Sequence, residues 1–168
     1  MVNTVINALV AFLIGGATLS FNFSAVDAAG NSQYEGSGSV ITLGENYRME
    51  TDEILVVSNG SVKGIYQKGI DEIVLLPVAP SSGADAAVSG ADIMDNPFAL
   101  LRNPGRMYDI STMGMDAEGI PMQIVMKAKT GAVYTISIQK YSKLPAPDPS
   151  LFTLNPDDYP SAVVTDLR

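Results

Sequence analysis

The side chains that carry most enzyme chemistry are missing from this chain. It has no cysteine and no histidine, which excludes thiolate metal sites, cysteine nucleophiles and imidazole bases. A serine nucleophile would lack its usual base for the same reason. Acidic pairs remain at Asp71-Glu72, at Asp116 and Glu118, and at Asp157-Asp158. Glycosidase chemistry needs two carboxylates that flank a sugar, whereas these acids fall in predicted turns. We therefore predict no catalytic residue and no enzyme activity.

Two further classes of ligand are disfavoured by the composition. The formal net charge is -8, which argues against binding to the phosphate backbone of a nucleic acid. Asp148, Asp157 and Asp158 offer the oxygen ligands that Ca²⁺ prefers, but their spacing matches no calcium-binding loop. We predict neither a metal nor a cofactor.

The chemistry that the sequence does favour is the burial of hydrocarbon. The chain has eight methionines, which are adaptable apolar side chains suited to ligands of varied shape. Each buried CH₂ group contributes roughly 0.8 kcal/mol, so an acyl chain gains much from an apolar cleft. The candidate lining of such a cleft is Phe21, Phe23, Met49, Met94, Phe98, Leu101, Met122, Ile124 and Met126. The alternative is that these residues form a closed, dry core.

Predicted strands position most of these side chains. Apolar and polar residues alternate along them, as in an antiparallel sheet with one face in water. Gly36 and Gly38 leave a bare patch on one strand, which permits either a bend or the close approach of another group. The strands are expected at residues 19–25, 33–43, 47–50, 54–58, 62–67, 71–78, 107–112, 122–127 and 134–139, with short edge pieces at Phe152, Leu154 and 163–167.

The most apolar stretch, Val2 to Leu19, has three interpretations. We favour a helix that begins at Asn3 or Thr4 and ends at Gly15-Gly16, buried on most sides because it has no polar face. A signal segment would lack the basic residues that normally precede its apolar run. A transmembrane helix would be interrupted by several polar residues and by the glycine pair.

Within Ser81 to Asn103, a second, short helix is expected over Ala91 to Leu101, after the small, polar connection Pro80 to Gly90. Asp92 or Asp95 can cap it, and Met94, Phe98 and Leu101 recur at the spacing of one helical face. Because Pro97 disfavours helical geometry in the residue before it, two short turns are an equal alternative.

These elements predict a single domain over residues 1–168, mainly β with some α. About nine or ten antiparallel strands form one sheet, and a sheet of that size curls. Its concave face is apolar, and the two helices are expected to cover it.

Several short motifs occur in an order and spacing that resemble the periplasmic lipoprotein-carrier (LolA-like) family, from about Leu19 to the C-terminus. They are Glu35-Gly36-Ser37-Gly38, Ser58-Asn59-Gly60, Asn96-Pro97-Phe98 through Leu101, Leu151 to Pro156 and Val163 to Arg168. By the same resemblance, Val5 to Ile14 corresponds to the family's first helix and Met94 to Leu101 to part of its lid. The family usually carries a basic residue followed by proline after its second strand, where this chain has Leu43-Gly44-Glu45-Asn46.

The resemblance implies an incomplete antiparallel β-barrel with a helical lid, located in the periplasm. Its cavity would shield the acyl chains of lipoproteins, or another lipid, during transport toward the outer membrane. The implied partners are an inner-membrane release complex and an outer-membrane receptor. The alternative function is an exported all-β assembly or adhesion module that has a closed core, carries no lipid and donates its N-terminal segment to a neighbour. The helix-like composition of Val5 to Ile14 argues against such strand donation.

Overall fold

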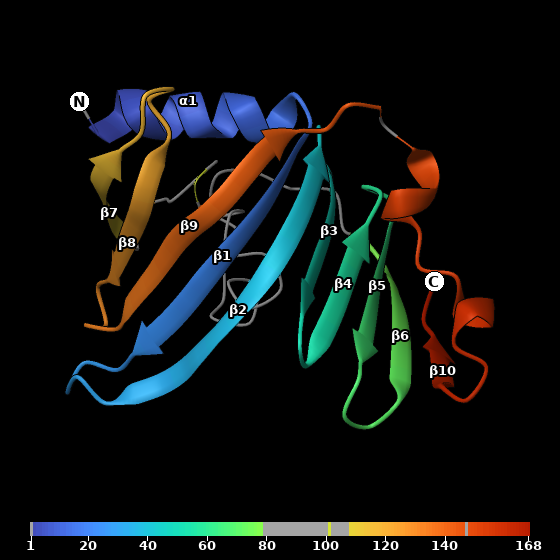
Figure 1. Cartoon of the computed structure of the whole chain (residues 1–168). Coiled ribbons are helices and arrows are strands. Elements are labelled where there is room, and N and C mark those ends of the chain that lie inside the picture. Colours follow the sequence, from blue (N-terminus) through green and yellow to red (C-terminus); the bar gives the residue numbers. More distant parts are fainter. Residues whose placement is uncertain (1, 79–100, 102–107, 147) are drawn as a thin grey trace.

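The computed structural model describes residues 2–78, 101, 108–146 and 148–168 (Figure 1). All ten strands join in one sheet, in the order β10-β6-β5-β4-β3-β2-β1-β9-β8-β7. The elements are α1 Val2–Ile14, β1 Ala17–Val26, β2 Ser32–Leu43, β3 Asn46–Thr51, β4 Ile54–Ser58, β5 Val62–Gln67, β6 Glu72–Pro77, β7 Tyr108–Met115, β8 Pro121–Ala128, β9 Val133–Lys143, the 3₁₀ turns η2 Pro149–Phe152 and η3 Pro156–Asp158, and β10 Val163–Asp166.

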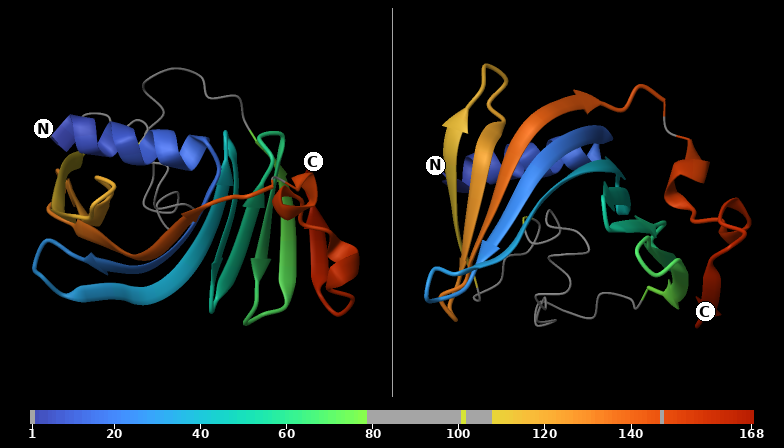
Figure 2. Two further views of the ribbon diagram at one scale, coloured as in Figure 1. Left: turned by 45° about the horizontal axis from the view of Figure 1, so that its top comes forward. Right: turned by 60° about the horizontal axis from the view of Figure 1, so that its bottom comes forward.

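The sheet curls without closing, since β7 and β10 lie at its two edges and do not pair with each other. The predicted fold class, an incomplete curled barrel with a helix on its hollow side, is confirmed (Figure 2). Neighbouring strands are antiparallel except β10 and β6, which are parallel. The prediction of antiparallel order throughout is therefore wrong at this edge, because the chain crosses the outer face after β9 and returns in the direction of β6.

The hollow side of the sheet holds the larger apolar cluster. Along β1 the residues Leu19, Phe21, Phe23 and Ala25 are buried, as their alternation with polar residues predicts. Side chains from β2, β3, β4, β8, β9 and α1 join the same cluster. The rings of Phe21 and Phe23 lie opposite the bare patch of β2, where Gly38 and Gly36 are their cross-strand partners.

The absence of side chains at Gly38 on β2 is explained by the close approach of Phe21 and of the backbone of β3. A Cβ atom at Gly38 would lie 3.2 Å from Cζ of Phe21 and 2.8 Å from the carbonyl oxygen of Glu50. An aromatic ring therefore packs on backbone at this position, and no larger residue fits without a shift.

The helix α1 ends at the predicted glycines but is buried on one side alone. Ile6, Leu9 and Leu13 face the sheet, whereas Ala8, Ala11 and Ile14 are exposed. The prediction that α1 is buried on most sides is wrong, because a helix lying across a sheet contacts it through a single stripe of residues. Val10 and Phe12, beside that stripe, are half-buried and pack against the same cluster. Among the residues whose side chains are described, the exposed side carries small or polar residues, apart from Ile14 at 43% exposure.

Hydrogen bonds to the sheet fix the C-terminal end of α1. The buried Thr42 hydroxyl donates to the carbonyl oxygen of Leu13 at 2.7 Å. The amide of Gly44 donates to the carbonyl oxygen of Ile14 at 2.8 Å. The amide of Leu144, beyond β9, donates to the carbonyl oxygen of Gly16 at 3.0 Å. Carbonyl groups at a helix end lack intrahelical partners, so these bonds both satisfy and position the end of α1.

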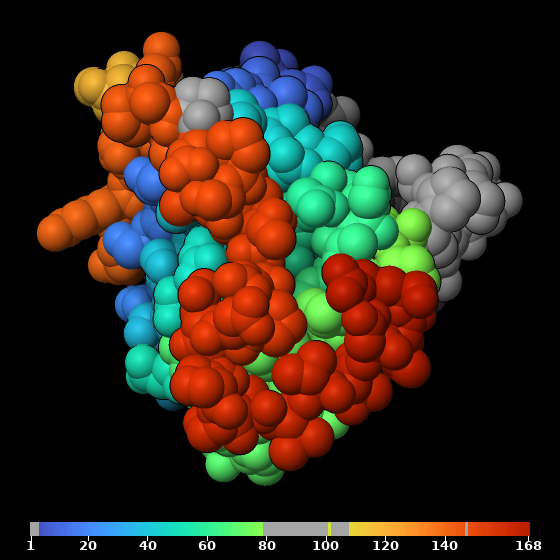
Figure 3. Space-filling model, turned by 90° about the vertical axis from the view of Figure 1, so that its right-hand side faces the viewer, coloured from blue at the N-terminus to red at the C-terminus, as the bar shows by residue number. Residues whose placement is uncertain are grey.

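The outer face of β4 to β6 holds a second apolar cluster, which the sequence analysis did not foresee. Leu55, Val57, Ile73 and Leu75 are buried there together with Leu154. The C-terminal segment, orange to red in Figure 3, lies over these strands. The prediction that Phe152 and Leu154 form edge pieces of the sheet is wrong. Phe152 ends the η2 turn and Leu154 follows it, in a segment with prolines at 149 and 156 that cannot donate to a β-ladder.

Among the described residues, no helix has the length and apolar character needed to cross a membrane.

Replacement of Gly64 tests the packing of the outer cluster. A Cβ atom at Gly64 would lie 2.8 Å from both Cβ and Cδ2 of Leu154. We expect Gly64→Ala to lower the free energy of unfolding by about 1–3 kcal/mol, since the added methyl group must displace Leu154. Gly69→Ala is the matched control, because nothing lies within 4 Å of its Cβ position. Equal midpoints of the two variants in urea unfolding would contradict this packing.

Replacement of Thr42 tests the attachment of α1. Thr42→Val keeps the shape of the side chain but removes one of two donors to the carbonyl oxygen of Leu13, the other being the amide of Gly16 at 3.2 Å. We expect a cost of about 0.5–1.5 kcal/mol in unfolding free energy. Thr18→Val is the control, because the Thr18 hydroxyl bonds Ser142 at an exposed position. Urea unfolding of the two variants measures the difference. A cost for Thr42→Val no larger than that for Thr18→Val would show that this hydrogen bond does not hold the helix.

Candidate functional site

The structure brings most of the predicted lining residues into one cluster on the hollow face. Phe21, Phe23, Met49, Leu101, Ile124 and Met126 all belong to it, and none is more than 5% exposed. Met122 lies outside the cluster and is 37% exposed. Met94 and Phe98 lie outside the described residues, as does the predicted helix that would carry them.

Cross-strand register explains how residues distant in the sequence meet. Phe23 of β1 pairs with Ile136 of β9, and Ile136 pairs with Ile124 of β8. On the other side of β1, Val40 of β2 pairs with Met49 of β3. The apolar surface therefore runs without interruption across the middle of the sheet, from β3 to β8.

Met122 departs from this surface at an irregularity in the ladder between β7 and β8. No pair joins Gly114 to Met122, although the pairs on both sides of them are formed. Gly114 has φ of +64°, a left-handed conformation that is costly for other residues. Gly114 lies two residues past the predicted strand 107–112, and this glycine was the signal that could have warned of the break. The neighbouring Met113 and Met115 are 60% and 58% exposed.

Two parts of the chain cover the described hollow. α1 contacts β1, β2, β7 and β8 and places Ile6, Leu9 and Leu13 in the cluster. Leu101, from the connection between β6 and β7, is 3% exposed in the same cluster. The hollow is thus bounded by a helix whose end is fixed and by a residue of the long β6–β7 connection.

Three tyrosines that the sequence analysis did not include lie beside the predicted lining. Tyr34 and Tyr134 flank Ala25 in one cross-strand row, and their ring centroids lie 5.9 and 6.3 Å from that of Phe23. The ring of Tyr108 meets that of Tyr134 edge-on at 6.3 Å. Each is half-buried, packed against the apolar cluster. Burial, followed by the negative charge of Glu53, raises the pKa of Tyr34.

Two of the three acidic pairs contain residues with tyrosine partners. The hydroxyl of Tyr141 donates to the carboxylate of Asp116 and lies 3.0 Å from Oε2 of Glu118. The contact with Asp116 raises the pKa of Tyr141 and lowers that of Asp116. The hydroxyl of Tyr66 donates to Asp71 at 2.9 Å. These contacts give Asp71, Asp116 and Glu118 a role in holding turns against the sheet.

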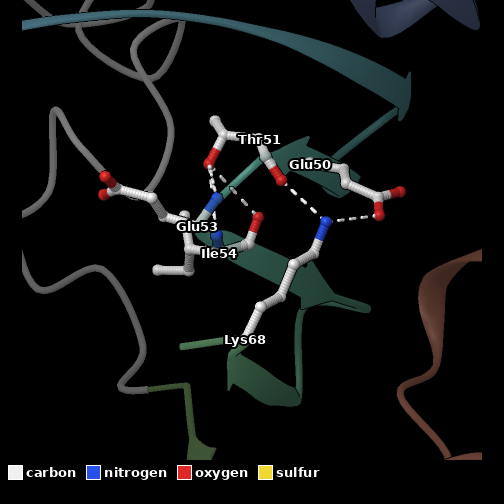
Figure 4. Close-up of polar contacts among 5 residues, drawn as sticks. All are labelled: Glu50, Thr51, Glu53, Ile54 and Lys68. Atoms are coloured by element: carbon white, nitrogen blue, oxygen red, sulfur yellow. Dashed lines mark hydrogen bonds and ion pairs between the residues drawn. The ribbon is translucent and has the colours of Figure 1, made fainter. Parts of the chain in front are cut away.

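The outer face of β1 to β3 differs in character from the hollow face. Nζ of Lys68 lies 2.9 Å from Oε1 of Glu50 and donates to the carbonyl oxygen of Thr51 at 2.7 Å (Figure 4). These residues border an open depression of about 360 Å³ on the outer face, which is otherwise lined mainly by serine, asparagine and glutamine side chains. This surface is polar and does not suit hydrocarbon. Within the ranges that the structure describes, no three potential metal ligands come together.

Comparison with solved structures finds the same architecture. A LolA superfamily protein from Nitrosomonas europaea is similar over 91% of this chain and 97% of its own, with a TM-score of 0.58 and 13% identity. An uncharacterized conserved protein from Thermus thermophilus is similar over 97% of both chains, with a TM-score of 0.54 and 11% identity. No family model matches the sequence, and no curated protein matches it.

These similarities, at low identity and nearly full coverage, concern the fold. The resemblance drawn from the sequence motifs is confirmed at that level: the chain has the LolA-like fold.

Proposed function

We propose that this protein is a lipid carrier that holds acyl chains, of lipoproteins or of another lipid, in the hollow of its curled sheet. The observation that supports the proposal is the continuous apolar cluster on the hollow face, which includes Phe21, Phe23, Met49, Leu101, Ile124 and Met126. The LolA-like fold gives independent support, since the named relative belongs to that superfamily.

The energetics favour a long hydrocarbon as the ligand. A chain of about 16 carbons gains roughly 13 kcal/mol when it is fully buried, at about 0.8 kcal/mol per CH₂ group. Loss of translational and rotational freedom costs about 4–15 kcal/mol. A short chain, or one buried along half its length, would therefore gain too little. The extent of the apolar surface, from β3 to β8, fits this need.

A lipid can enter this hollow if part of its cover moves, because the lining residues are almost fully buried. The hydrogen bonds from Thr42, Gly44 and Leu144 hold the end of α1 in place. We therefore assign the displaceable part of the cover to Leu101, which is buried in the cluster. The sequence resemblance implies a lid in the same part of the chain.

The proposal extends to a setting in the periplasm. In this setting the carrier would transfer lipid toward the outer membrane, with an inner-membrane release complex and an outer-membrane receptor as partners. The support for the transfer and for these partners is the LolA-like resemblance. The proposal includes no catalytic step. The alternative of an assembly module that donates its N-terminal segment is disfavoured, because residues 2–14 form a helix tied to the sheet.

A fluorescent fatty-acid probe tests the proposal with two isoleucine variants. Ile124 on the hollow face and Ile73 on the outer face are both fully buried. Each Ile→Ala change should lower stability by about 2–5 kcal/mol through the cavity it leaves. We expect the unchanged protein to bind the probe at micromolar concentration or tighter. Ile124→Ala should weaken binding at least threefold, whereas Ile73→Ala should leave it unchanged, in fluorescence titrations at a temperature where both variants are folded.

Failure of the folded, unchanged protein to bind the probe would overturn the proposal and favour the closed-core alternative. Equal loss of affinity in the two variants would place the lipid elsewhere. Mass spectrometry of lipids extracted from protein of the native source identifies the cargo.

A further inference from the structure

The two ends of the hollow differ in chemistry. At one end α1 lies over the sheet, and Leu9, Leu13, Leu19 and Val40 are almost completely buried. At the opposite end, where β1 finishes and β2 and β9 begin, Tyr34 and Tyr134 stand on either side of the small Ala25. Tyr108, at the start of β7, joins them through its ring contact with Tyr134. Fully buried aliphatic side chains thus gather at the α1 end, beside the half-buried Phe12, Tyr47 and Tyr141, whereas three half-buried tyrosines meet at the other end.

The tyrosine end is suited to the boundary between hydrocarbon and water. Tyrosine has an apolar ring and a polar tip, and it accumulates where one side of a site is dry and the other wet. The three rings are half-buried, unlike the fully buried side chains near α1. Within the described part of the chain, the hydroxyl of Tyr134 has no hydrogen-bond partner. That of Tyr141, at the α1 end, is engaged by Asp116 and Glu118.

We propose that Tyr34, Tyr108 and Tyr134 form the head-group end of the lipid site, so that a bound lipid places its ester groups among these rings and directs its tails toward α1. This inference rests on the proposed lipid-carrier function and adds the direction of the ligand. It also identifies the polar group recognised at the tyrosine end.

The charges near the tyrosine end favour an ester over a free carboxylate. Glu53 and Asp52 act on Tyr34 with negative charge, and the chain as a whole carries a net charge of -8. These groups would weaken the binding of a carboxylate relative to that of an ester of the same chain length. An ester carbonyl carries no net charge and accepts a hydrogen bond from a phenol hydroxyl.

Paramagnetic broadening tests the direction directly. Two methyl esters of stearic acid, one with a nitroxide near the ester and one with a nitroxide near the tail end, are added separately to isotopically labelled protein. We expect the first to broaden the NMR signals of Ala25 and Tyr134, and the second to broaden those of Leu9 and Leu19. Reversed patterns, or the same pattern for both probes, would overturn the proposed direction while leaving lipid binding intact. Absence of broadening from both probes, together with no binding, would overturn the carrier function itself.

A pair of conservative variants tests the role of the hydroxyl group. Tyr134→Phe keeps the ring and removes the hydroxyl, and we expect it to weaken binding of the methyl ester roughly threefold to tenfold. Tyr141→Phe, at the α1 end, removes a hydroxyl already engaged by Asp116 and should leave affinity unchanged. Thermal unfolding verifies that both variants are folded. Equal affinities of the two variants would show that the Tyr134 hydroxyl does not recognise the ester.

Discussion

Burial of one face of β1 is the constraint on which this fold depends. Five alternate residues from Ala17 to Ala25 are at most 7% exposed, and β1 lies well inside a ten-stranded sheet. A sheet of this width curls, which brings apolar side chains of distant strands against the same space. The helix that covers one end must have its terminal carbonyls satisfied. Thr42 and Gly44 near the end of β2, and Leu144 after β9, meet that need.

Alternation along each strand predicted the hollow face, because the residues that share a face can be identified one strand at a time. The outer cluster was not predictable in this way. Residues 54–57 are apolar without alternation, which indicates burial on both faces but does not say what covers the second face. The covering residue Leu154 lies about a hundred positions away in the sequence. Glycine at position 64 makes room for it, a relation that is visible once the strands are paired.

The candidate site was also predictable where it depends on alternation along single strands, and not where it depends on how strands pair. Phe21, Phe23, Ile124 and Met126 follow from the period of two, whereas the exposure of Met122 depends on the break at Gly114. The tyrosine end could not be found from the sequence. Its rings belong to β2, β7 and β9, and the register of several strands decides that they meet. Half-buried tyrosines are also ordinary residues within a strand pattern.

The separation of the two apolar clusters bears on how such a protein can open. A carrier has to expose or exchange one apolar surface while the rest of the fold persists. Here β4 contributes Val56 to the hollow and Leu55 and Val57 to the outer cluster. β4 therefore keeps its buried contacts on the outer face whatever occupies the hollow. Stability need not be uniform across a structure, and in the proposed carrier an acyl chain that displaced Leu101 would replace one apolar contact with another. The affinity for the ligand would then equal the free energy gained from its contacts in the hollow minus the free energy needed to open the cover.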